Sequence, residues 1–365
     1  MPSLQEILSY AVQNGASDVH LAVGSPPACR VDGEMRTFSE NPLKMEHTDK
    51  FLEEIFKPHQ RAHFEETGDA DLALSIAGLG RFRVNVLKQR GSIGIIMRHV
   101  KGKILKFEEL NLPAGLEYVV VMRRGLILVT GTTGSGKSTT LASIIDRINR
   151  TRRDHIITLE DPIEFLHQNK KSVVTQREIG IDTKDFKTAL RAAMREDPDV
   201  ILIGEMRDQE TFGAAMSAAE TGHLVFSTLH TTNCMLTMDR ILDMFPAAEH
   251  SQIRSQLALQ LKGTIAQRLI PSKDGKGRVP AVEIMYVNPA IAQLIRDGLN
   301  KQIPTAILGG RESGMQTFNM SLVELVKKDL VTLDEAIKNS DNSDELEMNL
   351  KGIYLSSSKG GILKK

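Results

Sequence analysis

Apolar residues occupy every second position in three short segments within the first hundred residues, at 72–76, 82–86 and 93–98. This two-residue period is typical of strands that bury one face of a sheet. The intervening positions include Arg83 in the second segment and Arg98 in the third. The pattern predicts a small mixed domain in which one face of the sheet presents arginines outward.

From Gly125 onward, short apolar runs alternate with amphipathic helical stretches, which is typical of a mostly parallel sheet covered by helices. Strands are predicted at 126–129, 156–159, 200–203 and 224–229. The clearest helix carries apolar residues at helical spacing, on Phe186, Ala189, Leu190, Ala193 and Met194. Beyond Pro246 we expect further helices, with loops at 271–280 and 303–314.

The segment 101–113 separates these two patterns. It has a basic, glycine-containing start and ends in the turn-forming Asn111-Leu112-Pro113, which together predict a linker. The chain of 365 residues also exceeds the roughly 250 residues at which single cores stop growing. We therefore predict an N-terminal domain at 1–100 and a larger α/β domain at 114–365.

The composition is that of an ordinary soluble globular protein, with 41% hydrophobic residues, 25% charged residues and a mean hydropathy of -0.18. No apolar run approaches the roughly 20 residues that a membrane-spanning helix needs. The N-terminal segment 1–10 carries Glu6 and no basic side chain, which is unlike a signal peptide. We expect a cytoplasmic protein.

The charge and the cysteines narrow the classes of partner. The 46 basic and 46 acidic residues cancel, which gives no global reason to expect direct contact with nucleic acid. Cys29 and Cys234 are the only cysteines, and no Cys or His lies at ligand spacing from either. Neither a zinc site nor a disulfide framework is therefore expected.

The strongest chemical signal is Gly131-Thr132-Thr133-Gly134-Ser135-Gly136-Lys137-Ser138, which matches the P-loop pattern G-x-x-x-x-G-K-[ST]. It lies between an apolar strand and a helix predicted over 137–149. The glycines let successive backbone amides point at phosphate oxygens, and the helix N-terminus adds partial positive charge. We expect this loop and Thr139 to bind ATP, with Lys137 on the terminal phosphates and Ser138 on Mg2+.

Hydrolysis also needs carboxylates, and two predicted strands end in them. The strand 200–203 is followed by Gly204-Glu205, and the strand 156–159 is followed by Glu160. Parallel strands deliver their carboxyl ends to the same edge as the P-loop. Glu205 is the first candidate to position or deprotonate the attacking water and Glu160 the second. Either could instead complete the Mg2+ shell, directly or through water, or be a solvated loop residue.

His223 and His230 flank the predicted strand 224–229. Too few further ligands lie nearby for a zinc site. A structural histidine remains one interpretation of each, and sensing of the γ-phosphate or coupling to a neighbouring subunit is the other.

Taken together, these segments resemble the secretion ATPase superfamily and, within it, the type IV pilus retraction ATPases of the PilT/PilU family. Residues 157–165 (ITLEDPIEF) look like the Asp box, 197–208 (DPDVILIGEMRD) like the atypical Walker B segment, and 219–231 (AETGHLVFSTLHT) like the His box. The resemblance covers nearly the whole chain and extends to 15–21, 80–86 and 314–322.

The resemblance implies a smaller PAS-like α+β domain joined to a RecA-like P-loop ATPase domain with C-terminal helices. It implies a homohexameric ring with ATP between the two domains, in which Arg83 and Arg98 reach the phosphates. Hydrolysis would drive retraction of type IV pili and support twitching motility. The implied partners are the pilus machinery and its inner-membrane platform protein, where the ring would dock peripherally, and a paralogous retraction ATPase.

One segment departs from the family. Retraction motors often carry Ala-Ile-Arg-Asn-Leu-Ile-Arg-Glu in the C-terminal region, whereas this chain has Ala292 and Gln293 in place of the first arginine and the asparagine. An accessory motor of the PilU kind therefore stays open beside an autonomous one.

Three other functions compete. A pilus-assembly or type II secretion ATPase shares the boxes but usually adds a long N-terminal domain and a tetracysteine zinc module, which favours retraction here. A DNA translocase on the same core is disfavoured by the zero net charge and the absence of Trp. A non-hydrolysing scaffold is disfavoured by the intact Lys137, Ser138, Glu160 and Glu205.

Overall fold

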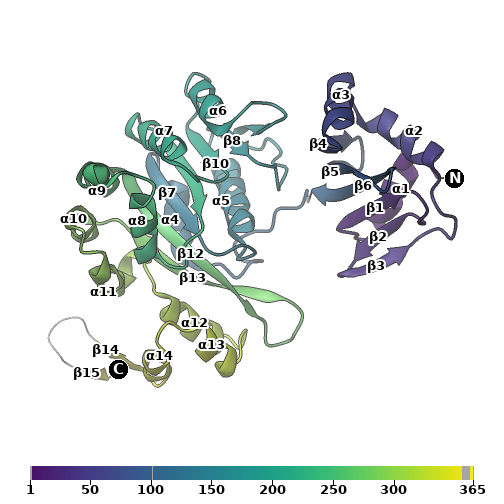
Figure 1. The fold of residues 1–365 in the computed structure, drawn as a ribbon. Coiled ribbons are helices and arrows are strands. Elements are labelled where there is room, and N and C mark those ends of the chain that lie inside the picture. Colours follow the sequence, from purple (N-terminus) through teal and green to yellow (C-terminus); the bar gives the residue numbers. More distant parts are fainter. Residues whose placement is uncertain (1, 101, 356–361, 365) are drawn as a thin grey trace. The chain divides into compact units, whose positions relative to one another are not determined.

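The computed structural model describes residues 2–100, 102–355 and 362–364. The chain forms two compact units, one of residues 1–103 with 162–166 and one of residues 104–161 with 167–365 (Figure 1). We call them the N-terminal unit and the C-terminal unit. This division assigns 104–113 to the C-terminal unit, whereas the sequence predicts a linker there, and the domain limits remain a prediction.

The N-terminal unit is built on a six-stranded antiparallel sheet in the order β3-β2-β1-β6-β5-β4. Its strands are β1 (Asp18–Ala22), β2 (Ala28–Val31), β3 (Glu34–Thr37), β4 (Asp69–Ile76), β5 (Gly80–Gln89) and β6 (Ser92–Val100). Its helices are α1 (Leu4–Gln13), α2 (Met45–Ile55) and α3 (Pro58–Thr67).

The core of this unit lies on one face of the sheet. Val84 and Met97 are fully buried there in one cluster with Leu8 of α1 and residues of α2 and α3. Arg83 and Arg98 occupy the alternate positions of the same strands and are exposed. The sequence-based prediction of an outward face that presents arginines is therefore confirmed.

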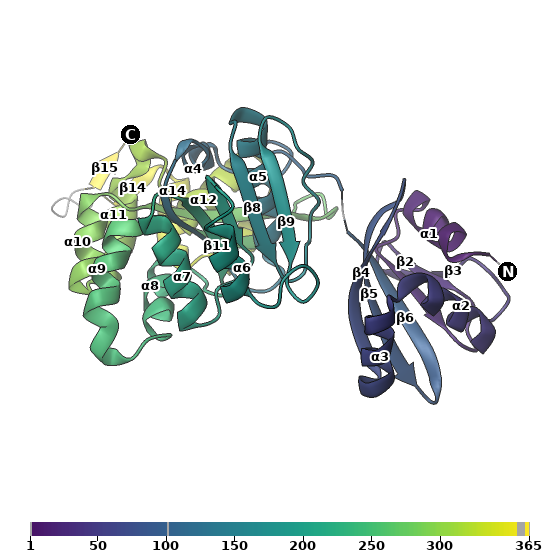
Figure 2. The same cartoon turned by 90° about the horizontal axis from the view of Figure 1, so that it is seen from above.

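The C-terminal unit holds a seven-stranded sheet in the order β13-β12-β7-β11-β10-β8-β9. Figure 2 shows β8 and β9 side by side at one end of this order. Its strands are β7 (Gly125–Thr130), β8 (His155–Glu160), β9 (Val173–Glu178), β10 (Val200–Ile203), β11 (Leu224–Leu229), β12 (Leu261–Pro271) and β13 (Arg278–Tyr286). All neighbours pair in parallel except β12 and β13, which are antiparallel. A separate hairpin pairs β14 (Ile353–Leu355) with β15 (Ile362–Lys364).

The helices of the C-terminal unit alternate with the strands and then follow them. They are α4 (Glu117–Val121), α5 (Lys137–Thr151), α6 (Phe186–Ala193), α7 (Gln209–Glu220), α8 (Cys234–Leu242), α9 (His250–Gln260), α10 (Pro289–Asp297), α11 (Ile303–Gly309), α12 (Phe318–Lys327), α13 (Leu333–Asn339) and α14 (Ser343–Leu350). Every residue of β7, β10 and β11 is buried, so both faces of the central sheet are covered. This is the α/β architecture that the alternation predicts.

The prediction of helices throughout the region beyond Pro246 is wrong at one point. There, β12 and β13 form a hairpin that extends the sheet, and β12 pairs in parallel with β7. Most of this hairpin is buried, so its apolar residues show no period that separates a strand from a helix. The predicted loop 303–314 is also partly wrong, because α11 begins at Ile303.

Among the described residues, no helix combines the length and the apolar character needed to cross a membrane.

Candidate functional site

The phosphate loop joins β7 to α5, as the sequence predicts. Gly131, Gly134 and Gly136 have φ angles of 148°, 77° and 88°, a region that residues with a Cβ rarely adopt. A Cβ at Gly131 would lie 2.5 Å from the backbone oxygen of Gln267, and one at Gly136 would lie 2.7 Å from Gln267 Nε2. Gly134 has open space around it, so only its conformation calls for glycine.

Lys137 is the first residue of α5 and its side chain folds over the loop. Its Nζ donates to the carbonyl oxygens of Gly131 at 2.8 Å and Thr132 at 3.1 Å. The ammonium therefore lies at the N-terminal end of α5, where the helix contributes partial positive charge. Ser138 follows it and is half-buried, as is Thr139.

The other loop residues differ in exposure. Thr132, Thr133 and Gly134 are exposed, whereas Ser135 is buried. The hydroxyl of Ser135 is a buried polar atom that makes no hydrogen bond to any described residue. Since buried hydroxyls are normally bonded, an unpartnered one inside a glycine-rich loop fits a polar ligand such as a phosphate.

The two candidate carboxylates lie at the ends of neighbouring strands. β8 and β10 pair in parallel, and the Gly204 amide donates to Leu159 O at 2.8 Å, so Glu160 and Glu205 leave the sheet side by side. Glu160 Oε1 accepts hydrogen bonds from Thr158 Oγ1 at 2.6 Å and Gln176 Nε2 at 3.1 Å. β7, which carries the phosphate loop, lies two strands from β10 in the sheet, or about 10 Å.

Glu205 has two cationic or potentially cationic neighbours. Arg207 Nη2 lies 2.8 Å from Glu205 Oε2, and His230 Nε2 lies 3.2 Å from Glu205 Oε1. The hydrogen bond to Glu205 raises the pKa of Arg207 above its ordinary value. The arrangement gives the Glu205 carboxylate one partner on each oxygen.

The structure separates the two candidate histidines. β11 runs from Leu224 to Leu229, so His223 precedes its amino end and His230 follows its carboxyl end. At about 3.3 Å per residue, some 20 Å of strand lies between them. His223 Nδ1 instead lies 2.9 Å from Ala218 O, at the amino ends of the strands and away from the phosphate loop. The fold therefore brings His230, but not His223, to Glu205.

The candidate arginines belong to the N-terminal unit. Arg83 and Arg98 are directly opposite each other on β5 and β6. Arg98 Nε donates to Asp18 Oδ1 at 2.7 Å, and Asp18 is 6% exposed. Burial alone would raise the pKa of Asp18, but the hydrogen bonds from Ser17 and Arg98 outweigh it and leave the pKa below its ordinary value.

Sequence reasoning missed three residues that hold these groups in place: Asp18, Arg207 and Gln267. Asp18 and Arg207 lie inside 15–21 and 197–208, two segments that carry the family resemblance, so their charges could have marked them as candidates. Gln267 lies in a region that was expected to be helical. Only the pairing of β12 with β7 brings it to the loop, and no local pattern announces that pairing.

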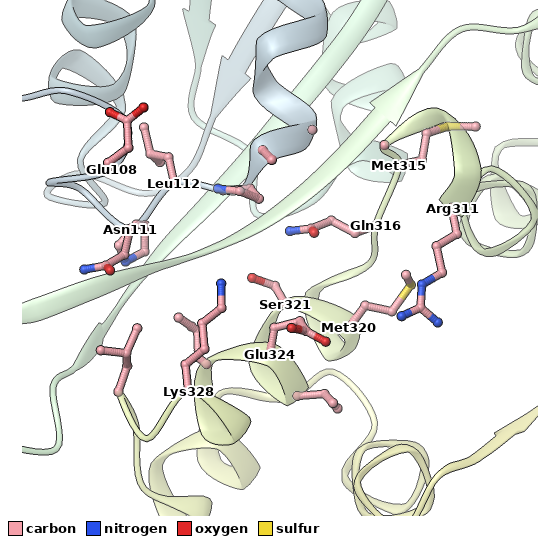
Figure 3. A pocket seen from close by; sticks show the side chains of 18 residues that line it. Glu108, Asn111, Leu112, Arg311, Met315, Gln316, Met320, Ser321, Glu324 and Lys328 are labelled. Atoms are coloured by element: carbon pink, nitrogen blue, oxygen red, sulfur yellow. The ribbon is translucent and has the colours of Figure 1, made fainter. Parts of the chain in front are cut away.

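The C-terminal unit also contains a cleft of about 470 Å³ between the segment 108–115 and α12. Figure 3 shows Ser321 and Lys328 extending into it from one side, with Asn111 on the other. None of the residues predicted to bind nucleotide is among the described residues that line it. Within the described part of the chain, no group of three or more His, Cys, Asp or Glu side chains is arranged to hold a metal ion.

Comparison with known proteins decides the family. The family model described as type II/IV secretion system protein matches residues 1–323. The chain belongs to this family.

Two members of the family from Pseudomonas aeruginosa are similar along most of their length. The type IV pilus retraction ATPase PilT is 47% identical over 333 residues, which cover 91% of this chain and 96% of the relative. The type IV pilus ATPase PilU is 39% identical over 347 residues, which cover 95% and 91%.

A crystal structure of the pilus retraction motor PilT with bound ADP has a TM-score of 0.87 and 47% identity, and the match covers 95% of this chain and 99% of that one. The likeness to the retraction branch of the family and the α/β fold class, both predicted from the sequence, are confirmed.

Proposed function

We propose that this chain is an ATPase motor that couples ATP hydrolysis to the retraction of type IV pili, and so supports twitching motility. One observation carries the proposal: the chain has a complete P-loop motif at 131–138 and is 47% identical over 333 residues to the retraction ATPase PilT. ADP bound to the crystallised PilT motor supports a nucleotide as the ligand of this cradle.

The phosphate loop binds the nucleotide through its backbone amides and Lys137. Exchange of the carbonyl contacts of Lys137 Nζ for phosphate oxygens would place a positive charge beside the terminal phosphates. The buried hydroxyl of Ser135 is available as a further donor. Ser138, Glu160 and Glu205 supply oxygen atoms, the ligands that Mg2+ prefers, directly or through water. When bound, Mg2+ neutralises charge that develops on the phosphates.

Glu205 orients the water that attacks the terminal phosphorus. Its carboxylate is held in place because Arg207 contacts one oxygen and His230 lies beside the other. A fixed, charged acceptor can align a water molecule for in-line attack and take its proton as the bond to ADP breaks. Glu160 is the second candidate for this role; its Oε1 accepts hydrogen bonds from neutral partners, Thr158 and Gln176, rather than from a cation.

The motor works as a homohexameric ring in which Arg83 and Arg98 reach the phosphates. Two exposed arginines lie opposite each other on neighbouring strands, and each carries a planar, permanently charged guanidinium group suited to phosphate oxygens. The ring works in the cytoplasm and docks at the inner membrane through the platform protein of the pilus machinery.

A second candidate is an accessory motor that works with a paralogous retraction ATPase. It is favoured by Ala292 and Gln293, which stand on α10 where retraction motors often carry Arg and Asn. Gln293 Nε2 donates to Asp297 Oδ2 at 2.8 Å and its Oε1 accepts from Arg296 at 2.6 Å, so its amide is engaged along the helix. If Ala292→Arg with Gln293→Asn confers retraction in a cell without the paralogue, and the wild type does not, the accessory role holds.

The experiment that tests the proposed function is deletion of the gene that encodes this chain, with pilus length and twitching as the readouts. Long pili without movement are expected, and rescue should require wild-type protein rather than Lys137→Ala. Absent pili would instead indicate an assembly ATPase. Normal pili with defective protein secretion would indicate a type II secretion ATPase. Binding of the purified protein to DNA, weakened by added salt, would favour a translocase.

A further inference from the structure

Gln267 is a buried polar side chain beside the phosphate loop, to which the sequence assigned no role. It lies on β12, next to the pair formed by Ala266 and Thr130 of β7, and is 2% exposed. Its Nε2 donates to the carbonyl oxygen of Ser135 at 2.7 Å. Its Oε1 accepts from the hydroxyl of Thr140 at 2.7 Å.

These two contacts join the two halves of the nucleotide cradle. Ser135 belongs to the loop, whereas Thr140 belongs to the first turn of α5, where its amide donates to Gly136 O at 3.0 Å. The Ser135 carbonyl can only accept a hydrogen bond, so the amide of Gln267 must face it with Nε2. One side chain therefore fixes the loop and the helix start relative to each other.

The same residue explains two glycines of the loop. The backbone oxygen of Gln267 lies under Gly131 and its side-chain nitrogen lies under Gly136, each too close for a Cβ. The loop thus packs against Gln267 of β12 at both ends, and at Gly131 the hydroxyl of Ser135 is equally close.

We propose that Gln267 is a positioning residue for nucleotide binding, which holds the phosphate loop in its binding conformation before the ligand arrives. A preorganised loop binds more tightly because the cost of ordering it is not subtracted from the binding free energy. This inference rests on the proposed function, since it takes the P-loop to be a nucleotide site.

The residue after Gln267 on β12 makes contacts away from the phosphate loop. The next residue, Arg268, donates to Asn339 O at 2.9 Å and to Asp341 at 2.8 Å, and its guanidinium lies 4.0 Å from the ring centre of Phe318. The strand that supports the phosphate loop is therefore itself tied to the C-terminal helices.

The test measures binding of a fluorescent ADP analogue to the full-length protein. Gln267→Met keeps the size of the side chain and removes both hydrogen bonds, and we expect it to weaken binding about tenfold, which corresponds to about 1.4 kcal/mol. Gln316→Met is the matched control, because Gln316 Nε2 donates to Val282 O at 2.7 Å outside the phosphate loop. The control is expected to bind as the wild type does.

A second variant tests whether the two hydrogen bonds themselves support binding. Gln267→Glu should bind poorly at pH 8, because an ionised carboxylate repels the Ser135 carbonyl. At pH 6 its affinity should recover relative to the wild type at the same pH, because a protonated carboxyl accepts from Thr140 and donates to Ser135 O. Wild-type affinity in Gln267→Met, or a Gln267→Glu to wild-type ratio that does not change with pH, would overturn the inference. Failure of the wild type to bind the analogue would overturn the proposed function instead.

Discussion

Glu205 and His230 meet at the carboxyl ends of two neighbouring parallel strands, with 3.2 Å between Glu205 Oε1 and His230 Nε2. Glu205→Gln keeps the shape of this side chain but removes the charge that aligns water. We expect the variant to bind ATP normally and to hydrolyse it at least 100-fold more slowly, within the range known for general-base removal. Single-turnover hydrolysis and an equilibrium binding assay measure the two steps separately.

Glu210→Gln is the control for this experiment. Glu210 is exposed on α7 and pairs with Lys187, so its substitution removes a carboxylate without touching the site. Rapid turnover by Glu205→Gln together with an inactive Glu160→Gln would transfer the catalytic role to Glu160.

Arg83→Ala and Arg98→Ala are each expected to lower ATP turnover at least tenfold in the full-length protein, through loss of charge from the phosphates. Asp18→Asn should lower it less, because it leaves Arg98 in place and removes only the negative charge of the group that accepts its Nε hydrogen bond. Arg36→Ala, at an exposed position on β3, is the control. Steady-state turnover measures these effects, and full activity in both arginine variants would leave the phosphate role without support.

The stability of the C-terminal unit should depend on pH through His167. Burial lowers the pKa of His167 from 6.5 to about 4, with Lys170 adding to the effect and Asp146 opposing it. The unfolded chain therefore takes up a proton below pH 6.5 that the folded chain excludes until about pH 4. The contribution of neutral His167 to the free energy of unfolding is therefore fully present well above pH 6.5. It falls as the pH drops from 6.5 toward 4, by about 2 kcal/mol at pH 5.

Urea unfolding at pH 7.5 and pH 5 tests this dependence. His167→Gln should lose about 2 kcal/mol less than the wild type over this interval, because it has no proton to gain. His63→Gln, at an exposed position on α3, should behave as the wild type does. An equal pH dependence in His167→Gln and the wild type would contradict the assignment.

A ring motor should lose more activity than the fraction of its subunits that are inactive. We expect a homohexamer whose turnover per subunit rises with protein concentration through the assembly range. Mixing Glu205→Gln subunits into the wild type should reduce activity more steeply than dilution, because each stalled site holds its neighbours. Mass measurement in solution with a mixing titration provides the test. A monomer whose activity falls only with the wild-type fraction would exclude the ring.

The sequence predicted the central strands closely, because each has a clear start and end. β10 and β11 have the predicted limits, and the glycine-rich loop lies between β7 and α5 as its motif requires. The hairpin of β12 and β13 was missed although Ser272–Gly277 is rich in turn-forming residues, since burial on both faces removed the period of the strands.

The candidate site was predictable only where a motif lies along the chain. Lys137 and Glu205 follow from local patterns, whereas the hydrogen bond from Gln267 to Ser135 joins residues 132 positions apart. His223 and His230 look alike in the sequence, and only the direction of β11 distinguishes them.

The two adjacent contacts on β12 restrict where the chain can change length. Side chains alternate along a strand, so an insertion or deletion of one residue before Gln267 would exchange the two faces. A deletion would bring the permanent cation of Arg268 to the position beneath the phosphate loop, whereas an insertion would move the neutral amide of Gln267 to the position that faces Phe318. The exposed turn at 273–277 carries no such constraint. Length variation among relatives of this chain should therefore gather in that turn and be absent from the strand.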